Sequence, residues 1–186
     1  MKRFLSSLII VSIVLLMQIS PVFGFDVRQK LSDITDFSPV IITAQTIEST
    51  TKIESEKNCD NEVVMTYVNM EVTSCIKGSV DPSSIITIKM IGGRHGSKGT
   101  WHELYSNFIK GEEYLLFLHQ VQGVENLWEM KSISSKLPID NQKSSQKIDC
   151  SMLRHDDFYQ KGMNPEIDKN MLIERIKGFI KRQGGK

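Results

Sequence analysis

Residues 62–78, EVVMTYVNMEVTSCIKG, carry the longest strict two-residue alternation in the chain, and they constrain its fold more than any other stretch. One side of this repeat carries mainly apolar residues: Val64, Val68, Met70, Val72 and Ile76, with Thr66 and Ser74 between them. The other side is mixed and includes Tyr67, Glu71 and Cys75. The pattern predicts one long, half-buried β-strand that ends at Gly78 and forms the spine of a small antiparallel sheet or barrel.

Residues 1–24 have the features of a secretory signal peptide. Two basic residues precede an apolar run at residues 5–17, and Gly24 supplies a small residue before the predicted cleavage site, which leaves Phe25 as the new N-terminus. The apolar run is shorter than the roughly 20 residues that a membrane-spanning helix needs. We therefore predict a secreted or periplasmic protein with no membrane association after cleavage.

Length and charge limit the class of protein. Removal of the signal leaves 186 − 24 = 162 residues, which suits one domain. The signal holds two of the 23 basic residues and none of the 22 acidic ones, so the mature net charge is 21 − 22 = −1. Without a basic block, this charge predicts no binding to nucleic acid or to an anionic membrane.

The remaining periodicity predicts several further strands. β-branched or apolar runs stand at residues 40–46 (continuing toward 53), 85–93 and 127–133. A continuous apolar run at residues 114–118 is typical of a strand covered on both faces. The polar stretch at residues 55–61 is predicted to be the turn of a hairpin.

Two helices are predicted at the ends of the mature chain. A short lead-in helix is expected within residues 25–36, where Val27, Leu31 and Ile34 share one face. At residues 164–186 an amphipathic helix is expected to dock on the barrel through an apolar stripe made of Met171, Leu172, Ile173, Ile176, Phe179 and Ile180. The polar residues 136–163 between domain and helix are predicted to be a linker, so the barrel domain with its lead-in helix spans residues 25–135.

Four sequence segments carry a resemblance to a known family. IITAQT, TYVNMEVTSCIKG, IITIKMIGG and GEEYLLFL follow one another in the order seen in a family of secreted bacterial domains of unassigned function. The match covers residues 31–133, and the family's Leu-Lys-Gly-like turn is here Ile76-Lys77-Gly78. The strand order is also similar to the OB-like barrel of netrin-type modules, which include the tissue inhibitors of metalloproteinases. The resemblance implies a mainly β fold, namely a small antiparallel OB-like β-barrel with the two flanking helices.

The inhibitors chelate the protease zinc through an N-terminal Cys, whereas the mature chain here would begin with Phe25. Their zinc-chelating mechanism therefore does not transfer to this chain.

The three cysteines predict one disulfide and one remaining thiol, because an oxidising compartment favours pairing. Cys59 and Cys75 would lie roughly 40 Å or more apart along one hairpin arm at about 3.3 Å per residue. A disulfide needs α-carbons within about 7 Å. We therefore predict a bond between Cys75 and Cys150.

No complete catalytic motif is present in the chain. His102-Glu103 begins a zinc-protease motif, but Ser106 stands where the second His is required. His95, His102 and His119 could meet at the mouth of the barrel and bind zinc or copper, which gives the alternative hypothesis of a metal-dependent hydrolase. The main prediction is a protein with no catalytic residues and no cofactor.

The loop of residues 92–105 holds the candidate binding residues, which are Arg94, His95, Trp101, His102 and Tyr105. Trp, Tyr and Arg are over-represented at binding hot spots, and barrel loops are common recognition surfaces. We predict a noncatalytic interaction module that binds an extracytoplasmic protein or glycan, with inhibition of a protease by loop insertion as one form. The alternative for Trp101 is that it fills one end of the barrel.

Overall fold

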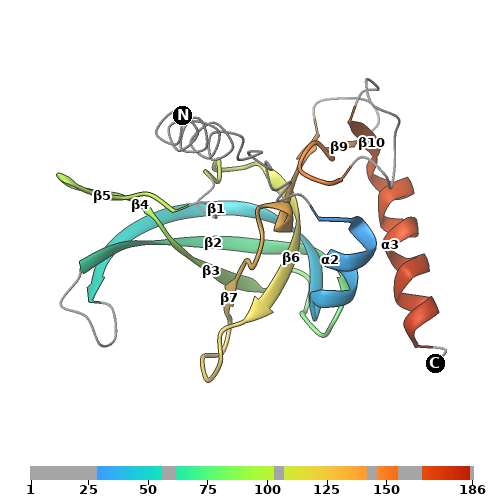
Figure 1. Cartoon of the computed structure of the whole chain (residues 1–186), viewed down its shortest axis with the longest axis horizontal. Coiled ribbons are helices and arrows are strands. Elements are labelled where there is room, and N and C mark those ends of the chain that lie inside the picture. Colours follow the sequence, from blue (N-terminus) through green and yellow to red (C-terminus); the bar gives the residue numbers. More distant parts are fainter. Residues whose placement is uncertain (1–28, 56–61, 103–106, 142–145, 155–164, 185–186) are drawn as a thin grey trace, which may run out of the picture.

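The computed structural model describes residues 29–55, 62–102, 107–141, 146–154 and 165–184. These residues are mainly β-strand, with a short helix near the N-terminus and a longer helix at the C-terminal end (Figure 1). The predicted signal peptide and the turn of the first hairpin lie outside the described residues. The prediction of a mainly β fold with two flanking helices is confirmed.

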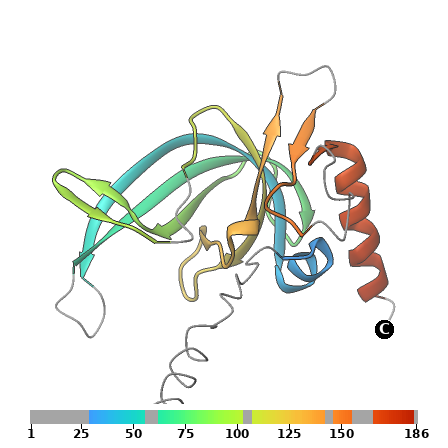
Figure 2. The same cartoon turned by 45° about the horizontal axis from the view of Figure 1, so that its top comes forward.

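The first two strands form a long antiparallel hairpin. β1 (Val40–Ser55) pairs with β2 (Glu62–Lys77) along its length, and both curve as one ribbon past the rest of the sheet (Figures 1 and 2). Gly78 follows β2 with a φ of 96°, and a Cβ there would lie 2.8 Å from Cγ2 of Val40. The chain therefore requires glycine where the strand ends.

An extra residue in β2 changes which side chains face the core. Thr73 has no partner in the register with β1, which is the arrangement of a β-bulge. Before it, Val68, Met70 and Val72 belong to one hydrophobic core cluster, which we call the cluster between the strands. After it, Cys75 packs against this same cluster, whereas Ile76 packs against a second core cluster. The predicted single face through Ile76 is therefore wrong beyond Val72.

The other strands join both edges of this hairpin. β3 (Ile85–Ile91) pairs with β2, β6 (Glu113–Gln120) pairs with the first part of β1, and β7 (Leu127–Glu129) is parallel to β3 and antiparallel to β6. The pairing order is thus β1-β2-β3-β7-β6, with β6 also paired to β1.

Three short strands extend the sheet outward from β6. They are β8 (Lys136–Asp140), β9 (Lys147–Asp149) and β10 (Glu166–Asp168), and β8 follows the 3₁₀ turn η1 (Ile133–Ser135). Leu137, Ile139 and Ile148 in β8 and β9 are buried. The prediction of a polar linker is therefore wrong at 136–140 and 147–149, because a few apolar residues among many polar ones are enough to add short edge strands.

Two core clusters lie on opposite faces of β1 and β6. In β6, Tyr114, Leu116 and Leu118 join the cluster between the strands, whereas Leu115 and Phe117 join the second cluster. The second cluster also holds buried residues of α2 (Leu31–Phe37) and α3 (Lys169–Gln183). The prediction that this strand is covered on both faces is confirmed.

The C-terminal helix docks on the second cluster through Leu172 and Ile176, which are fully buried. It begins later than predicted, because residues 166–168 pair with β9 as a strand. Asp168 is the N-cap, and its carboxylate accepts hydrogen bonds from the backbone N–H groups of Asn170 and Met171.

Candidate functional site

A small hairpin follows β3 within the segment that was predicted to be a long loop. β4 (Gly93–His95) pairs with β5 (Lys98–Thr100) as a separate two-stranded sheet. Gly92 and Gly93 turn the chain out of β3 with φ angles of 119° and 114°, which only glycine adopts readily. The loop prediction is therefore wrong for this part of the segment.

Both strands of the β1–β2 ribbon hold the hairpin. Hydrogen bonds that make this attachment include those from Thr66 Oγ1 to Gly92 O (2.6 Å), from Val64 N to Thr100 Oγ1 (2.9 Å) and from Thr51 Oγ1 to Arg94 O (3.0 Å). The turn between β4 and β5 is exposed. The hairpin therefore has an anchored base and an accessible tip.

Four of the five predicted binding residues are described. Arg94 and His95 are exposed on β4, and Trp101 comes directly after β5 with 86% of its surface exposed. The alternative that Trp101 fills an end of the barrel is wrong. His102 is half-buried, and Tyr105 lies outside the described residues.

The polar side chains of β4 make local contacts. Arg94 Nε donates a hydrogen bond to Gly96 O at 3.2 Å, and His95 Nδ1 lies 3.2 Å from Thr51 Oγ1. Trp101 is the most exposed large apolar side chain in the part of the chain that the structure describes. Exposed aromatic surface of this size is typical of interaction sites.

A pocket of about 410 Å³ lies next to this segment. We call it the methionine pocket, since three methionines line it together with apolar and charged neighbours: Met65, Lys89, Met90, Ile91, His102, Val121, Glu129, Met130 and Lys131. Methionine side chains are flexible and polarizable, so they adapt to different apolar groups. The pocket therefore suits an apolar group.

The position of the pocket follows from the strand pairing. β3 and β7 are paired only from Thr87 to Lys89 and from Leu127 to Glu129. Met90 and Ile91 continue β3 past this ladder, and Met130 follows β7. The methionine pocket lies at the end of this ladder, where Lys89 and Glu129 form the last pair and Met90, Ile91 and Met130 continue beyond it.

Charged groups on and beside the pocket wall are already paired. Lys131 forms an ion pair with Glu129, and Lys89 Nζ lies 2.8 Å from a carboxylate oxygen of Glu54. Burial by itself raises the pKa of Glu54, but the hydrogen bond and positive charge of Lys89 hold that pKa below its usual value. These contacts hold the two lysine side chains in place, and none of them pairs a nucleophile with a base.

The three histidines of the metal hypothesis are not brought together. His95 lies on the hairpin, His102 lines the methionine pocket, and the ring of His119 packs against Phe37 with centroids 4.8 Å apart. Burial and then the positive charge of Lys131 lower the pKa of His119. Among the described residues no group of three His, Cys, Asp or Glu side chains could hold a metal ion.

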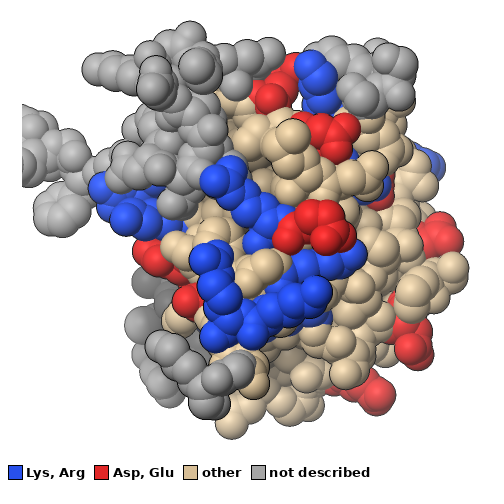
Figure 3. Space-filling view, turned by 90° about the vertical axis from the view of Figure 1, so that its right-hand side faces the viewer, with Lys and Arg blue, Asp and Glu red and all other residues tan. Residues whose placement is uncertain are grey.

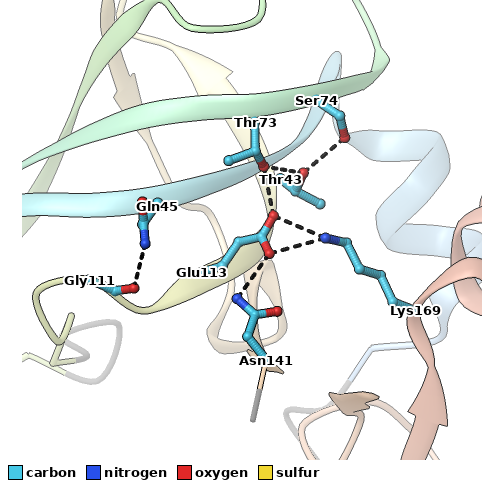
Figure 4. A network of polar contacts seen from close by, with 8 residues as sticks. All are labelled: Thr43, Gln45, Thr73, Ser74, Gly111, Glu113, Asn141 and Lys169. Carbon is cyan, nitrogen blue, oxygen red and sulfur yellow. Dashed lines mark hydrogen bonds and ion pairs between the residues drawn. The ribbon is translucent and has the colours of Figure 1, made fainter. Parts of the chain in front are cut away.

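A polar network that no sequence motif predicted joins α3 to the sheet (Figure 4). The buried Glu113 carboxylate accepts hydrogen bonds from Thr73 Oγ1 (2.7 Å) and Asn141 Nδ2 (3.2 Å) and forms an ion pair with Lys169. Burial alone raises the pKa of Glu113, but the Thr73 hydrogen bond and the Lys169 charge lower it below its usual value. The sequence signal for this network was the two adjacent acidic residues Glu112 and Glu113, which stand directly before the most apolar run of the domain.

The predicted disulfide between Cys75 and Cys150 is not formed. Cys75 packs against the cluster between the strands, and its Sγ lies 3.5 Å from Lys77 O. Cys150 is buried in the second cluster. The β-bulge in β2 turns Cys75 to the face opposite the one predicted, and Cys59 lies outside the described residues.

Comparisons with known proteins add no identification. No family model matches the chain, and no curated protein matches its sequence. Among the described residues, no helix is both long enough and apolar enough to cross a membrane.

Proposed function

We propose that the protein is a secreted or periplasmic, noncatalytic module that binds a partner protein through hairpin β4–β5 and the methionine pocket. One observation carries this proposal: Trp101, which is 86% exposed, is directly followed by His102, which lines the pocket. The exposed aromatic side chain and a residue of the pocket wall are thus neighbours in the chain. A partner side chain in the pocket would bring its neighbours against the Trp101 ring.

The architecture proposed for this module is an OB-like barrel of the secreted bacterial family named above. Support comes from the five-strand pairing order with its additional β1–β6 pairing and from the parallel β3–β7 pair. An OB fold is a five-stranded, partly open Greek-key barrel that binds ligands on its sheet face and loops. The proposed location rests on residues 1–24 of the sequence.

The chemistry favours a protein partner over a glycan. Trp and Arg are enriched among residues that dominate binding energy, and Trp101 and Arg94 are both exposed here. Methionine-lined surfaces accept varied apolar side chains, which a protein partner supplies. Because the hairpin base is hydrogen-bonded to β1 and β2, little ordering of this segment is needed on binding.

Photo-crosslinking tests this proposal. A photoreactive amino acid replaces Trp101 in cells that make the protein, and the control places it at Ile85, which is 59% exposed at the start of β3. We expect a specific adduct from position 101 alone, whose partner is identified by mass spectrometry. Equal adducts from both positions contradict the proposal.

The purified partner then gives a quantitative measurement. We expect the double variant Arg94→Ala/Trp101→Ala to bind it at least about 30-fold more weakly, because hot-spot truncations typically lose 2 kcal/mol or more. The melting temperature should stay that of the unmodified protein, and Ile85→Ala should bind normally. Unchanged affinity of the double variant overturns the proposed site.

A narrower form of the proposal is inhibition of a protease by insertion of the hairpin. It is supported by the exposed β4–β5 turn, by Arg94 beside that turn, and by the similarity to netrin-type barrels. A protease that cleaves after Arg should be inhibited in proportion to the added protein, and Arg94→Ala should abolish this. Rapid cleavage of the hairpin without inhibition contradicts the proposal of protease inhibition. The general proposal of partner binding is then decided by the crosslinking and affinity experiments.

A further inference from the structure

The outward side of α3 carries a concentration of positive charge (Figure 3). Four exposed cations lie on it, namely Arg175, Lys177, Lys181 and Arg182, against one exposed acid, Glu174. The local charge is therefore 4 − 1 = +3 over three helical turns. We call these five residues, together with Met171, the basic face.

Helix docking fixes the direction of the basic face. Leu172 and Ile176 are fully buried against the second core cluster, so residues about half a turn away around the helix point to solvent. Lys177 bonds to Glu174 Oε1 at 2.8 Å, and its side chain is still 48% exposed. The basic face cannot turn inward without exposing the core side of α3.

One apolar side chain lies among these cations. Met171 is 64% exposed, and Arg175 and Arg182 follow it four and eleven residues later, on the same side of the helix. The Arg182 guanidinium stacks over the partly covered Phe179 ring at 4.6 Å. The face thus combines positive charge with an exposed flexible thioether.

The basic face and the hairpin lie at opposite ends of the molecule. In Figures 1 and 2, α3 stands at one end of the longest dimension and β4–β5 reaches toward the other. A surface that held α3 would leave the hairpin and Trp101 accessible. Binding at α3 would therefore be independent of the partner of the hairpin.

We infer that the basic face binds an anionic lipid surface. Charge complementarity carries this assignment, because cations clustered on an amphipathic helix are attracted by the negative potential of acidic lipid headgroups. The exposed Met171 favours lipid over nucleic acid, since it can enter the headgroup layer. α3 has no fully exposed aromatic ring on which bases could stack. The mature net charge of −1 predicted no such binding, but a net charge does not record where the charges lie.

Vesicle binding tests the inference. The probes are vesicles of phosphatidylcholine alone and of an equimolar mixture with phosphatidylglycerol, and the protein is the chain that begins at Phe25. We expect sedimentation with the anionic vesicles only, and loss of binding when the salt rises from about 0.05 M to about 0.5 M. Lys181→Gln/Arg182→Gln should weaken partitioning about 30-fold, since each cation near the surface contributes about fivefold.

A matched variant removes the same charge at the other end of the molecule. Lys52→Gln/Lys98→Gln should bind anionic vesicles like the unmodified protein, and circular dichroism melting should show that both variants are folded. Absence of binding to anionic vesicles, equal binding to both vesicle types, or equal weakening by the two variants overturns the inference. Tighter binding to a single-stranded oligonucleotide than to anionic vesicles overturns it in favour of nucleic acid.

Discussion

The ammonium nitrogen of Lys169 lies 3.0 Å from both carboxylate oxygens of Glu113. Lys169 is the first residue of α3 and Glu113 is the first residue of β6, so this pair ties the C-terminal helix to a central strand. The two side chains are 15% and 7% exposed. An ion pair removed from water to this degree depends on both partners.

Replacement of Lys169 by Met should lower the free energy of unfolding by about 3–5 kcal/mol, because the Glu113 carboxylate would remain buried without its counter-charge. The double variant Glu113→Gln/Lys169→Met should regain part of this loss, since it buries no charge. Urea unfolding at pH 7 measures both values. If the loss of stability in the double variant equals the sum of the losses in Glu113→Gln and Lys169→Met, the two residues act independently.

Glu113 should also contribute to acid unfolding. Its folded pKa is depressed below the ordinary value of 4.5, so its contribution is present above the unfolded pKa and is lost as the pH falls through the folded pKa. Stability should therefore decrease below about pH 4.5, and this decrease should be smaller in Glu113→Gln. Urea midpoints measured across this range check the slope, and an identical slope in both proteins would contradict the assignment.

Neighbouring residues of α3 should differ sharply in their effect on stability. Leu172→Ala should cost about 2–5 kcal/mol because Leu172 is fully buried against the second cluster. Met171→Ala should change stability by less than about 0.5 kcal/mol, since Met171 is 64% exposed. Equal effects in thermal or urea unfolding would mean that the helix docks through a different face.

The two tryptophans offer a matched comparison. Trp128 is 8% exposed in the cluster between the strands, so Trp128→Ala should cost about 3–5 kcal/mol. Trp101→Ala should leave the melting temperature unchanged. In the single-tryptophan variants made by Trp→Phe replacement, the fluorescence of Trp101 should be that of a solvated ring and the fluorescence of Trp128 that of a buried one. A blue-shifted Trp101 would contradict its exposed position.

The thiols should react at different rates. Burial, and then the charge of Asp149, raise the pKa of Cys150 to about 12, so its thiolate is scarce and inaccessible in the folded protein. In a Cys59→Ser background at pH 8, the half-buried Cys75 should react with a disulfide reagent first, and Cys150 should react only on unfolding. Reaction of both thiols at the same rate would contradict this expectation. So would nonreduced protein in which neither Cys75 nor Cys150 has a free thiol.

Several features of the fold could be predicted because they depend on local pattern. The alternation in residues 62–78 predicted β2, the apolar run at residues 114–118 predicted a strand covered on both faces, and the stripe around Leu172 predicted a docked helix. Each of these signals repeats over several residues, so a single exception does not remove it. The candidate site was predicted in part in the same way, since Arg94 and Trp101 are large groups in a glycine-rich segment.

Only the tertiary structure decided which residues meet. The β-bulge at Thr73 moved Cys75 to the opposite face of β2, and nothing in the alternation marks one extra residue. The methionine pocket joins Met65, Met90 and Met130 because the β3–β7 ladder stops at Lys89, which is a property of strand pairing between distant segments. The sequence by itself determined the long strands, the two helices and the polar or apolar character of most of their faces. The positions of Glu113 against Lys169 and of Trp101 outside the core depended on long-range packing, which acts between residues far apart in the chain and leaves no periodic trace in it.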